Sequence, residues 1–245
     1  VWAPWESTSK TEKMARAGRL IERLSACLAL AAALVLASCG GGTVETTPAK
    51  RQQKKEATLV RTPLFSADSA YAFVERQVAF GNRVPNSAGH RKCGDYLIGQ
   101  LEAFGAAVTV QEARVKAYDG TNLDIRNIFG AFNPREKRRI LLYAHWDTRP
   151  YADKDSVRTK EPIDGANDGA SGVGVLLELA RIMSDSLPKV GVDIAFFDAE
   201  DYGEPEWLPN RDSDYTDWCL GSQYWARKPH IPGYRAKYGI LLDMV

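Results

Sequence analysis

Apolar residues recur at helical spacing in two neighbouring segments of the chain. The first follows Ser66 and ends at Gly81, and the second follows Ser87 and ends at Gly105. Serine is a favoured helix N-cap and glycine a favoured C-terminal stop, so each segment carries the signals of a complete helix. The apolar stripes are Ala70, Phe73, Val74 and Val78 in the first segment and Tyr96, Leu97, Leu101 and Phe104 in the second.

Beyond Gly105 the pattern changes to apolar runs of strand length. Such runs occupy residues 107–115, 123–132, 139–144, 190–197 and 238–242, and helical patterns occupy 172–183 and 222–226. Strands that alternate with helices are typical of a parallel sheet covered on both faces, and the two early strands can join it as antiparallel neighbours. We predict an α/β fold, a three-layer α/β/α sandwich around a central mixed, mostly parallel sheet. Because the sequence stops just after the last strand, we expect the sandwich to be incomplete at its C-terminus.

The N-terminal residues have a different character from this fold. Residues 1–13 have no apolar period and precede the first methionine, so we interpret them as a leader of doubtful origin. Residues 14–38 join three arginines to an apolar stretch shorter than the roughly 20 residues that span a bilayer, which is typical of a secretory signal peptide. The segment ends in small residues before Cys39, as in a bacterial lipoprotein signal, and we expect Cys39 to carry the lipid. The alternative is a plain secretory signal with an incidental cysteine.

These features give a domain plan and a location. Residues 39–63 hold the lipidated cysteine and a flexible tether rich in Gly, Thr, Lys and Gln, and residues 64–245 hold a partial catalytic domain. We expect an exported protein, a periplasmic or cell-surface lipoprotein of a bacterium, attached to the membrane through the lipid anchor on Cys39. Of the other cysteines, Cys93 and Cys219 belong to the domain, and we favour two free thiols over a disulfide.

Composition narrows the class of partner. The chain has 245 residues, of which 44% are hydrophobic and 26% charged, as in an ordinary globular domain. Its formal net charge is only +1, so we expect neither a nucleic-acid partner nor a polybasic protein surface that binds a membrane.

Carboxylates follow the apolar runs at four places. They lie in His145-Trp146-Asp147, Asn167-Asp168-Gly169, Asp198-Ala199-Glu200-Asp201 and at Asp243. Open α/β sheets bind their ligands at the carboxyl ends of the strands, so these side chains are expected to gather in one place. Asp, Glu and His together are the ligands that Zn²⁺ commonly takes in enzymes. The sequence therefore predicts a zinc-dependent enzyme, and we interpret it as one acting on peptide N-termini.

Each of these residues also has a purely structural interpretation. Asp168 can cap the helix that begins near Ser171, and Asp243 can form a turn. The adjacent Glu200 and Asp201 can be a solvated acidic turn, or one can bind metal while the other moves a proton. His145 and Asp147 face the same side of an extended segment, where the carboxylate can orient the imidazole.

Aromatic residues cluster around the acids, and three tryptophans, Trp146, Trp207 and Trp218, are candidates for a substrate pocket. The remaining histidines, His90 and His230, lie in a turn-like and a proline-flanked segment, and we expect both on the surface.

Taken together, five segments in order resemble bacterial glutaminyl cyclases of the zinc-dependent exopeptidase superfamily. The segments are 143–150 (YAHWDTRP), 165–173 (GANDGASGV), 197–203 (FDAEDYG), 218–226 (WCLGSQYWA) and 238–245 (YGILLDMV). The likeness runs from about Ser66 to the end of the chain.

The resemblance implies residue roles. Asp168 and Asp201 would bind one Zn²⁺, Glu200 would move the proton, and Asp243 would steady the substrate amine and leaving group. His145 and Asp147 would correspond to a second metal site or to supporting residues. The resemblance also implies a cis peptide bond just after Asp168. The reaction would convert an N-terminal glutamine of peptides or proteins to pyroglutamate, with release of ammonia.

The resemblance leaves one ligand and two alternatives open. The remaining zinc ligand of these cyclases is a histidine beyond Asp243, so we expect this stretch of chain alone to bind zinc weakly and to be inactive. One alternative is a two-zinc aminopeptidase of the same superfamily, in which His145, Asp168 and Asp243 would share the second ion. The other is a non-catalytic surface lipoprotein with the same fold.

Overall fold

The computed structural model describes residues 62–209 and 216–245, all of which belong to the unit Val60–Val245. The predicted leader, signal peptide, lipidated Cys39 and most of the tether lie outside the described residues. Within those residues no helix has both the length and the apolar character needed to cross a membrane.

Two helices precede the sheet, as the pattern of the sequence predicts. They are α2 (Ala67–Val78) and α3 (Ala88–Ala103). The side chain of Ser66 accepts a hydrogen bond from the N–H of Ser69, and the side chain of Ser87 accepts one from the N–H of His90. Both serines are therefore the N-caps that the sequence predicts.

Five strands form one sheet in the order β1-β2-β4-β3-β5. The strands are β1 (Ala107–Lys116), β2 (Asn122–Phe132), β3 (Arg139–His145), β4 (Gly191–Phe197) and β5 (Gly239–Leu241). β3 is parallel to both β4 and β5, whereas β2 is antiparallel to both β1 and β4.

The mixed sheet is confirmed, but the expectation that it is mostly parallel is wrong, because parallel and antiparallel pairings are equally frequent. The short turn between β1 and β2, closed by the N–H of Ala117 on the carbonyl of Thr121, reverses the chain. Parallel neighbours need a longer crossover, usually a helix. Such helices occur after β3 and β4, namely α4 (Ala170–Asp185) and α5 (Leu220–Arg227).

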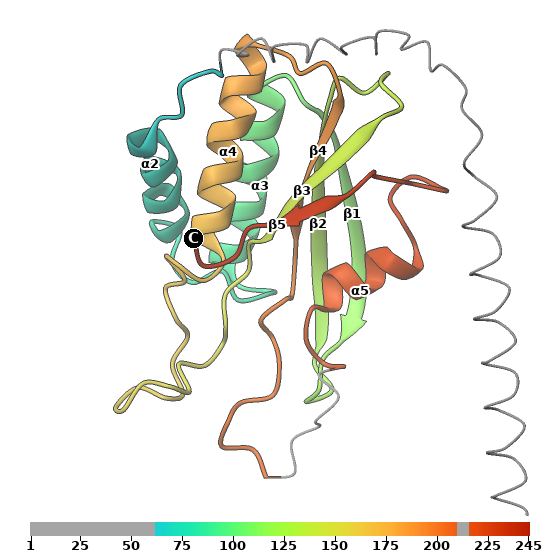
Figure 1. Ribbon diagram of the computed structural model, residues 1–245. Coiled ribbons are helices and arrows are strands. Elements are labelled where there is room, and N and C mark those ends of the chain that lie inside the picture. Colours follow the sequence, from blue (N-terminus) through green and yellow to red (C-terminus); the bar gives the residue numbers. More distant parts are fainter. Residues whose placement is uncertain (1–61, 210–215) are drawn as a thin grey trace, which may run out of the picture. The chain divides into compact units, whose positions relative to one another are not determined.

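Helices cover both faces of the sheet, which confirms the three-layer arrangement (Figure 1). The larger core packs α3 and α4 against one face, with Leu97, Leu176 and Ile194 fully buried. On the other face Trp225 of α5 packs against Phe129 and Phe197. Every residue of β4 is buried, so β4 is the central strand and fixes where the neighbouring strand ends lie.

Candidate active site

The acidic segments that follow β3, β4 and β5 meet at one edge of the sheet. His145, the last residue of β3, pairs in register with Phe197, the last residue of β4, and Tyr143 pairs with Leu241 at the end of β5. The chain leaves these strands on the side of the sheet where α4 begins (Figure 1). The prediction that the carboxyl ends of the strands gather these side chains is thereby confirmed.

His145 lies at the centre of the group. Its Nε2 is 3.0 Å from Asp168 and 3.5 Å from Asp243, and its Nδ1 is 3.5 Å from Asp147 and 3.9 Å from Glu200. Burial lowers the pKa of this imidazole, but the three aspartates around it outweigh burial and raise the pKa well above its usual value. Four acidic side chains from different parts of the chain therefore surround a single buried imidazole.

Asp168 enters the group from the loop that leads into α4. The next residue, Gly169, has φ of 92°, and a Cβ atom there would lie 2.5 Å from the backbone oxygen of Asp147. Glycine is required because both the left-handed conformation and the close backbone approach exclude a side chain. The peptide bond after Asp168 is trans, as are the peptide bonds of the described residues generally, so the expected cis bond is not present.

Asp201 is a carboxylate of the site whose pKa is strongly raised. One of its oxygens lies 3.5 Å from Arg149, and the other is buried without a hydrogen-bond partner. Burial, together with the charges of Asp168, Asp147 and Glu200, raises its pKa to about 8. Asp168 and Asp201 line the same cavity of about 650 Å³.

Asp147 supports the residues of the site through hydrogen bonds and does not line the cavity. It is fully buried, and its two oxygens accept hydrogen bonds from the N–H groups of Glu200 and Asp201, at 3.0 and 3.1 Å. Burial raises the pKa of Asp147, but His145 and these two N–H groups outweigh burial and lower it below its usual value. This geometry favours the supporting role over the metal-ligand role among the two that the sequence left open.

Glu200 is partly exposed, and the Nδ1 atom of His145 lies 3.9 Å from it, beyond hydrogen-bond distance. Its Oε1 accepts a hydrogen bond from the thiol of Cys219 at 3.3 Å. Burial raises its pKa, the charge of His145 opposes this, and the neighbouring carboxylates add to it, so that the pKa lies above its usual value. Such a carboxylate is suited to accept and return a proton.

The residues of this site fit a divalent cation. Asp147, Asp168, Glu200, Asp201 and Asp243 converge with Arg149 as the paired cation beside them, and one buried oxygen of Asp201 has no partner. Ligand atoms of His145, Asp168 and Asp243 all lie within 4.8 Å of one another. Uncompensated buried carboxylates are costly, and a metal ion is the usual compensation. His145, Asp168 and Asp243 are the residues expected to hold a second ion in a two-zinc aminopeptidase. The pair Asp168 and Asp201, expected to hold the single zinc of a cyclase, does not form such a group of three ligands.

Comparison with known protein families shows which family the site-bearing part of the chain resembles. The model of peptidase family M28 matches residues 127–245, which include every residue of this site. This matching part of the chain, just under half of its 245 residues, is thus similar to peptidase family M28. The expected superfamily is thereby confirmed.

Two solved structures and a curated relative are similar to the chain. A glutaminyl cyclase from Bacteroides thetaiotaomicron, solved with N-acetylhistamine bound, is 57% identical with a TM-score of 0.74, over 76% of this chain and 64% of that one. A Zn-dependent exopeptidase from Parabacteroides distasonis is also 57% identical, with a TM-score of 0.73, over 76% of this chain and 63% of that one. The glutaminyl-peptide cyclotransferase of Bos taurus is 34% identical over 119 residues, 44% of this chain and 31% of that protein.

The chain thus spans less than two thirds of each of these three proteins. The match to family M28 and the similarity to a Zn-dependent exopeptidase support zinc as the metal of this site. The number of ions does not follow from them.

The three tryptophans predicted to line a substrate pocket differ in burial and in their distance from the cavity. Trp146 is completely buried and stacks on His90, so its predicted place in a substrate pocket is wrong. It directly follows a strand and continues the core of the sheet. Trp218 lines the cavity that contains Asp168 and Asp201, with the guanidinium of Arg149 4.6 Å from its ring centroid. Trp207 is 42% exposed and packs against Tyr151, which lines the same cavity.

Both histidines expected on the surface are in fact packed. His90 is 1% exposed and hydrogen-bonds to the carboxylate of Asp198. The signal that identifies it is helical spacing, because His90, Cys93, Leu97 and Leu101 form the buried stripe of α3. His230 stacks on Phe129, with ring centroids 3.8 Å apart, and accepts a hydrogen bond from the indole of Trp225.

Two arginines that are not among the predicted site residues, Arg149 and Arg83, hold parts of the site in place through hydrogen bonds. Arg149 pairs with both oxygens of Asp153 and donates to the backbone oxygen of Asp201 at 3.1 Å. Arg83 is completely buried and donates to the backbone oxygens of Trp146, Asp164 and Gly165, which ties the Asp168 loop to the end of β3. No local motif identifies such long-range contacts. The two cysteines, Cys93 and Cys219, are free thiols, as expected.

Proposed function

We propose that the protein to which this chain belongs is a zinc-dependent glutaminyl-peptide cyclotransferase. Its substrates would be peptides or proteins with an N-terminal glutamine, which it converts to pyroglutamate with release of ammonia. The observation that carries the proposal is the position of Glu200, a partly exposed carboxylate 3.9 Å from His145, beside the cation-fitting group of Asp168, Asp201 and His145. The likeness to a bacterial glutaminyl cyclase at 57% identity supports the choice of reaction.

Asp168 and Asp201 would hold the metal in this proposal, because both carboxylates face the same cavity and Asp201 has an unpartnered oxygen. When bound, zinc supplies Lewis acidity that polarises the side-chain amide carbonyl of the substrate glutamine. The number of zinc ions proposed for the cyclotransferase is one.

Glu200 would move the proton that the reaction must transfer. The α-amino nitrogen of the substrate forms a bond to the side-chain carbonyl carbon, and the bond from that carbon to the amide nitrogen breaks. Glu200 accepts a proton from the attacking amine and returns it to the departing nitrogen, which leaves as ammonia. The nucleophile belongs to the substrate itself, so the remaining task of the protein is orientation. Asp243, which lies near the same Nε2 atom of His145 as Asp168, would orient the substrate amine.

Product analysis tests this proposal in the protein that contains this chain. Incubation with zinc and a peptide that begins with glutamine should release ammonia and leave a peptide lighter by the mass of ammonia and of unchanged sequence. The matched control is the same peptide beginning with asparagine or alanine, which should be unchanged. Release of a free amino acid in place of ammonia contradicts the cyclotransferase, and no product from any peptide favours the non-catalytic alternative.

A two-zinc aminopeptidase is the second candidate, and one observation favours it. His145, Asp168 and Asp243 form a compact set of three possible ligands, which is what a second ion needs. In that enzyme Glu200 would activate a water molecule for attack on the first peptide bond. The zinc content of the loaded protein separates the candidates, because about one ion per chain supports the cyclotransferase and two ions support the aminopeptidase.

We also propose that the protein is exported and held to a membrane by lipid on Cys39. The support is the order of basic, apolar and small residues before this cysteine. In a bacterial host, Cys39→Ala should abolish labelling of the protein by a radioactive fatty acid and shift it from the membrane fraction to the soluble fraction. Unchanged labelling of this variant would exclude Cys39 as the lipidation site.

A further inference from the structure

The turn Asp198–Asp201 carries Glu200 and Asp201, and its four backbone N–H groups all donate to side chains. Asp198 donates to Asn127 at 3.0 Å and Ala199 to the carboxylate of Asp198 at 2.7 Å. Glu200 and Asp201 donate to the two oxygens of Asp147. Three of these four N–H groups therefore depend on side chains from distant parts of the chain, Asn127 and Asp147.

The four carbonyl groups of the same turn are also bonded. Those of Asp198, Ala199 and Glu200 accept from the N–H groups of residues 221, 220 and 219 respectively, and that of Asp201 accepts from Arg149. Within the turn Ala199 has φ of 48°, a left-handed conformation that is costly for a residue with a side chain. Such a conformation persists only where the surroundings determine it fully. The contacts of the turn therefore maintain a strained backbone directly before Glu200.

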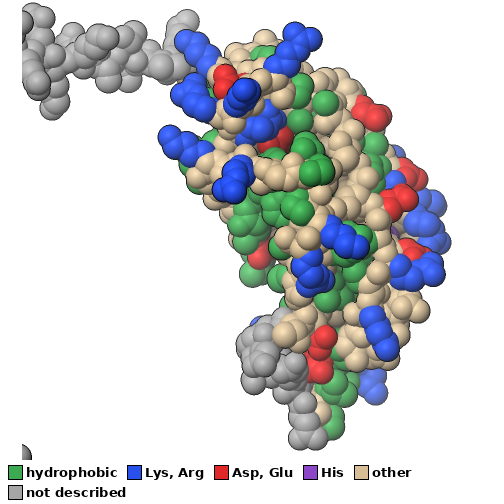
Figure 2. All heavy atoms as spheres, turned by 90° about the vertical axis from the view of Figure 1, so that its right-hand side faces the viewer, with side chains coloured by type: hydrophobic (Ala, Val, Ile, Leu, Met, Phe, Trp, Pro, Cys, Tyr) green, Lys and Arg blue, Asp and Glu red, His purple; other side chains and the backbone are tan. Residues whose placement is uncertain are grey.

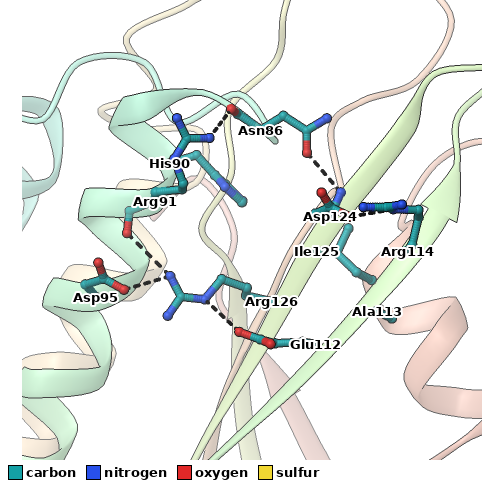
Figure 3. Close-up of a pocket in the computed structure, with 10 residues that line it drawn as sticks. All are labelled: Asn86, His90, Arg91, Asp95, Glu112, Ala113, Arg114, Asp124, Ile125 and Arg126. Carbon is teal, nitrogen blue, oxygen red and sulfur yellow. Dashed lines mark hydrogen bonds and ion pairs between the residues drawn. The ribbon is translucent and has the colours of Figure 1, made fainter.

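The carboxylate of Asp198 is the hub of these contacts. It is fully buried and lies near three donors, the N–H of Ala199, the N–H of Arg126 at 2.6 Å and Nε2 of His90 at 2.8 and 2.9 Å from its two oxygens. His90 is the side-chain donor of the three, and it comes from α3, outside the strands that bear the site. Figure 3 shows His90 of α3 among the residues that line a surface pocket, together with Arg126 of β2.

The imidazole of His90 also packs against the segment that follows β3. Its ring stacks on Trp146, with centroids 4.4 Å apart and planes inclined by 12°. Trp146 lies between His145 and Asp147 in the sequence, and its indole N–H donates to the backbone oxygen of Arg126. One buried side chain thus contacts both the segment after β3 and, through Asp198, the segment after β4.

We propose that His90 is a positioning residue, which acts through Asp198 to hold the left-handed turn that aims Glu200 and Asp201 into the site. It touches neither substrate nor metal in this assignment. The inference concerns turnover only if the proposed function is correct, but its effect on the backbone of the turn is independent of that function. Supporting contacts of this kind typically change activity by about 10–100-fold when removed.

Two substitutions of His90 differ only in their ability to reach Asp198. In His90→Gln the side-chain amide nitrogen is the same number of bonds from Cα as Nε2, so it can still donate to Asp198. In His90→Asn the amide is one methylene shorter and cannot reach. Both variants lose the stacking on Trp146 equally, so a difference between them reports on the bond to Asp198. His230→Leu is the matched control, because it removes a packed histidine from the opposite face of the sheet.

Amide hydrogen exchange of the zinc-free protein is the deciding measurement. In His90→Asn the amides of residues 199–201 should exchange roughly tenfold faster or more, while those of β4 keep the protection of the parent protein. His90→Gln should restore most of the protection, and His230→Leu should leave residues 199–201 unchanged. Equal exchange at residues 199–201 in the parent and His90→Asn overturns the inference. Equal acceleration throughout the domain in both His90 variants also overturns it, since the role would then be general stability.

Steady-state kinetics complete the test. With a glutaminyl peptide, His90→Asn should lower kcat by about 10–100-fold with little change in KM, and His90→Gln should recover most of the loss. If the parent protein releases no ammonia, the proposed function fails while the exchange experiment still decides the role of His90. If the parent is active and both His90 variants share its kcat, the positioning role is overturned.

Discussion

Two of the three buried aspartates in strand β4 and the turn after it, Asp193 and Asp201, differ in how their oxygens are bonded. Asp193, inside the strand, has each oxygen bonded, with Arg139 at 2.5 and 2.7 Å and the hydroxyl of Tyr234 at 2.8 Å. Asp201, in the turn, has one oxygen 3.5 Å from Arg149 and the other without a partner. The chain therefore contains a satisfied and an unsatisfied buried carboxylate a few residues apart.

The difference teaches how to distinguish structure from function in this domain. The group of Arg139, Asp193 and Tyr234 has its charges paired, so its contribution is to fasten the loop before β5 to the sheet. The group around His145 has an excess of carboxylates and an orphan oxygen, which costs free energy in the absence of a cation. Balanced buried charge is explained by stability, whereas unbalanced buried charge calls for a ligand.

The largest expected effect is on turnover, from Glu200→Gln. The amide keeps the size of the side chain but cannot accept and return the proton, so kcat for a glutaminyl peptide should fall by about 10²–10⁴-fold. The unfolding free energy should be nearly unchanged. Glu102→Gln, the same substitution at an exposed position of α3, is the control and should keep the kcat of the parent. A Glu200→Gln variant with the turnover of the parent would exclude this residue as the proton carrier.

Arg139→Met should produce the opposite profile, a large loss of stability without a loss of chemistry. Removing one partner of a buried ion pair leaves Asp193 unpaired, and such changes cost roughly 3–5 kcal/mol of unfolding free energy. Denaturant unfolding measures the loss, and kcat per folded molecule should equal that of the parent. Adding Asp193→Asn to Arg139→Met removes the stranded charge and should recover part of the stability. A double variant less stable than the single one would show that the charge is not the cause.

Asp201→Asn should separate the two kinds of cluster most directly. In the zinc-free protein, burial and the neighbouring carboxylates raise the pKa of Asp201 to about 8, so the charged form is disfavoured in the fold. Replacing it with a neutral side chain of the same shape should raise the unfolding free energy by about 1–3 kcal/mol in the presence of a chelator. The affinity for zinc should fall at the same time. A loss of stability in chelator, as Arg139→Met gives, would show that Asp201 is a structural residue.

The elements of the fold were predictable from the sequence because their signals are local. The caps Ser66 and Ser87, the apolar runs of β3 and β4, and the helix of residues 172–183 each depend on neighbouring residues, and each element is present with ends shifted by a few residues. The convergence of His145, Asp168, Glu200 and Asp243 was also predictable, because parallel strands end at the same edge. The number of parallel strand pairs was not predictable, because it depends on which strands become neighbours in the sheet.

The supporting residues of the site could not be predicted, because their contacts join distant parts of the chain. Arg83 reaches the loop of Gly165, and His90 reaches Asp198, with no spacing in the sequence to indicate either pair. The position of Trp146 beside site residues predicts a place in a pocket, but its side chain is buried in the core. The next residue along an extended segment faces the opposite side, so proximity in sequence to His145 is itself an argument for burial of Trp146.

The smallest expected effect comes from His230, which packs beside the balanced cluster. Burial lowers the pKa of His230; Asp193 opposes this and Arg139 adds to it. The folded protein therefore prefers the neutral imidazole, whose Nδ1 accepts the indole N–H of Trp225 at 2.9 Å. The associated stability is complete above the unfolded pKa of about 6.5 and is lost as the pH falls towards the lower pKa of the folded state.

His230→Leu removes this dependence because leucine cannot take up a proton. The difference in unfolding free energy between the parent and His230→Leu, measured in chelator from pH 7.5 to pH 5, should shift in favour of the variant as the pH falls, by roughly 1 kcal/mol or less. Taking the difference cancels the titration of His145 and its carboxylates, which both proteins share. Parallel curves would mean that protonation of His230 is tolerated in the fold, so that the balanced cluster, unlike the site, can accommodate an added charge without a ligand.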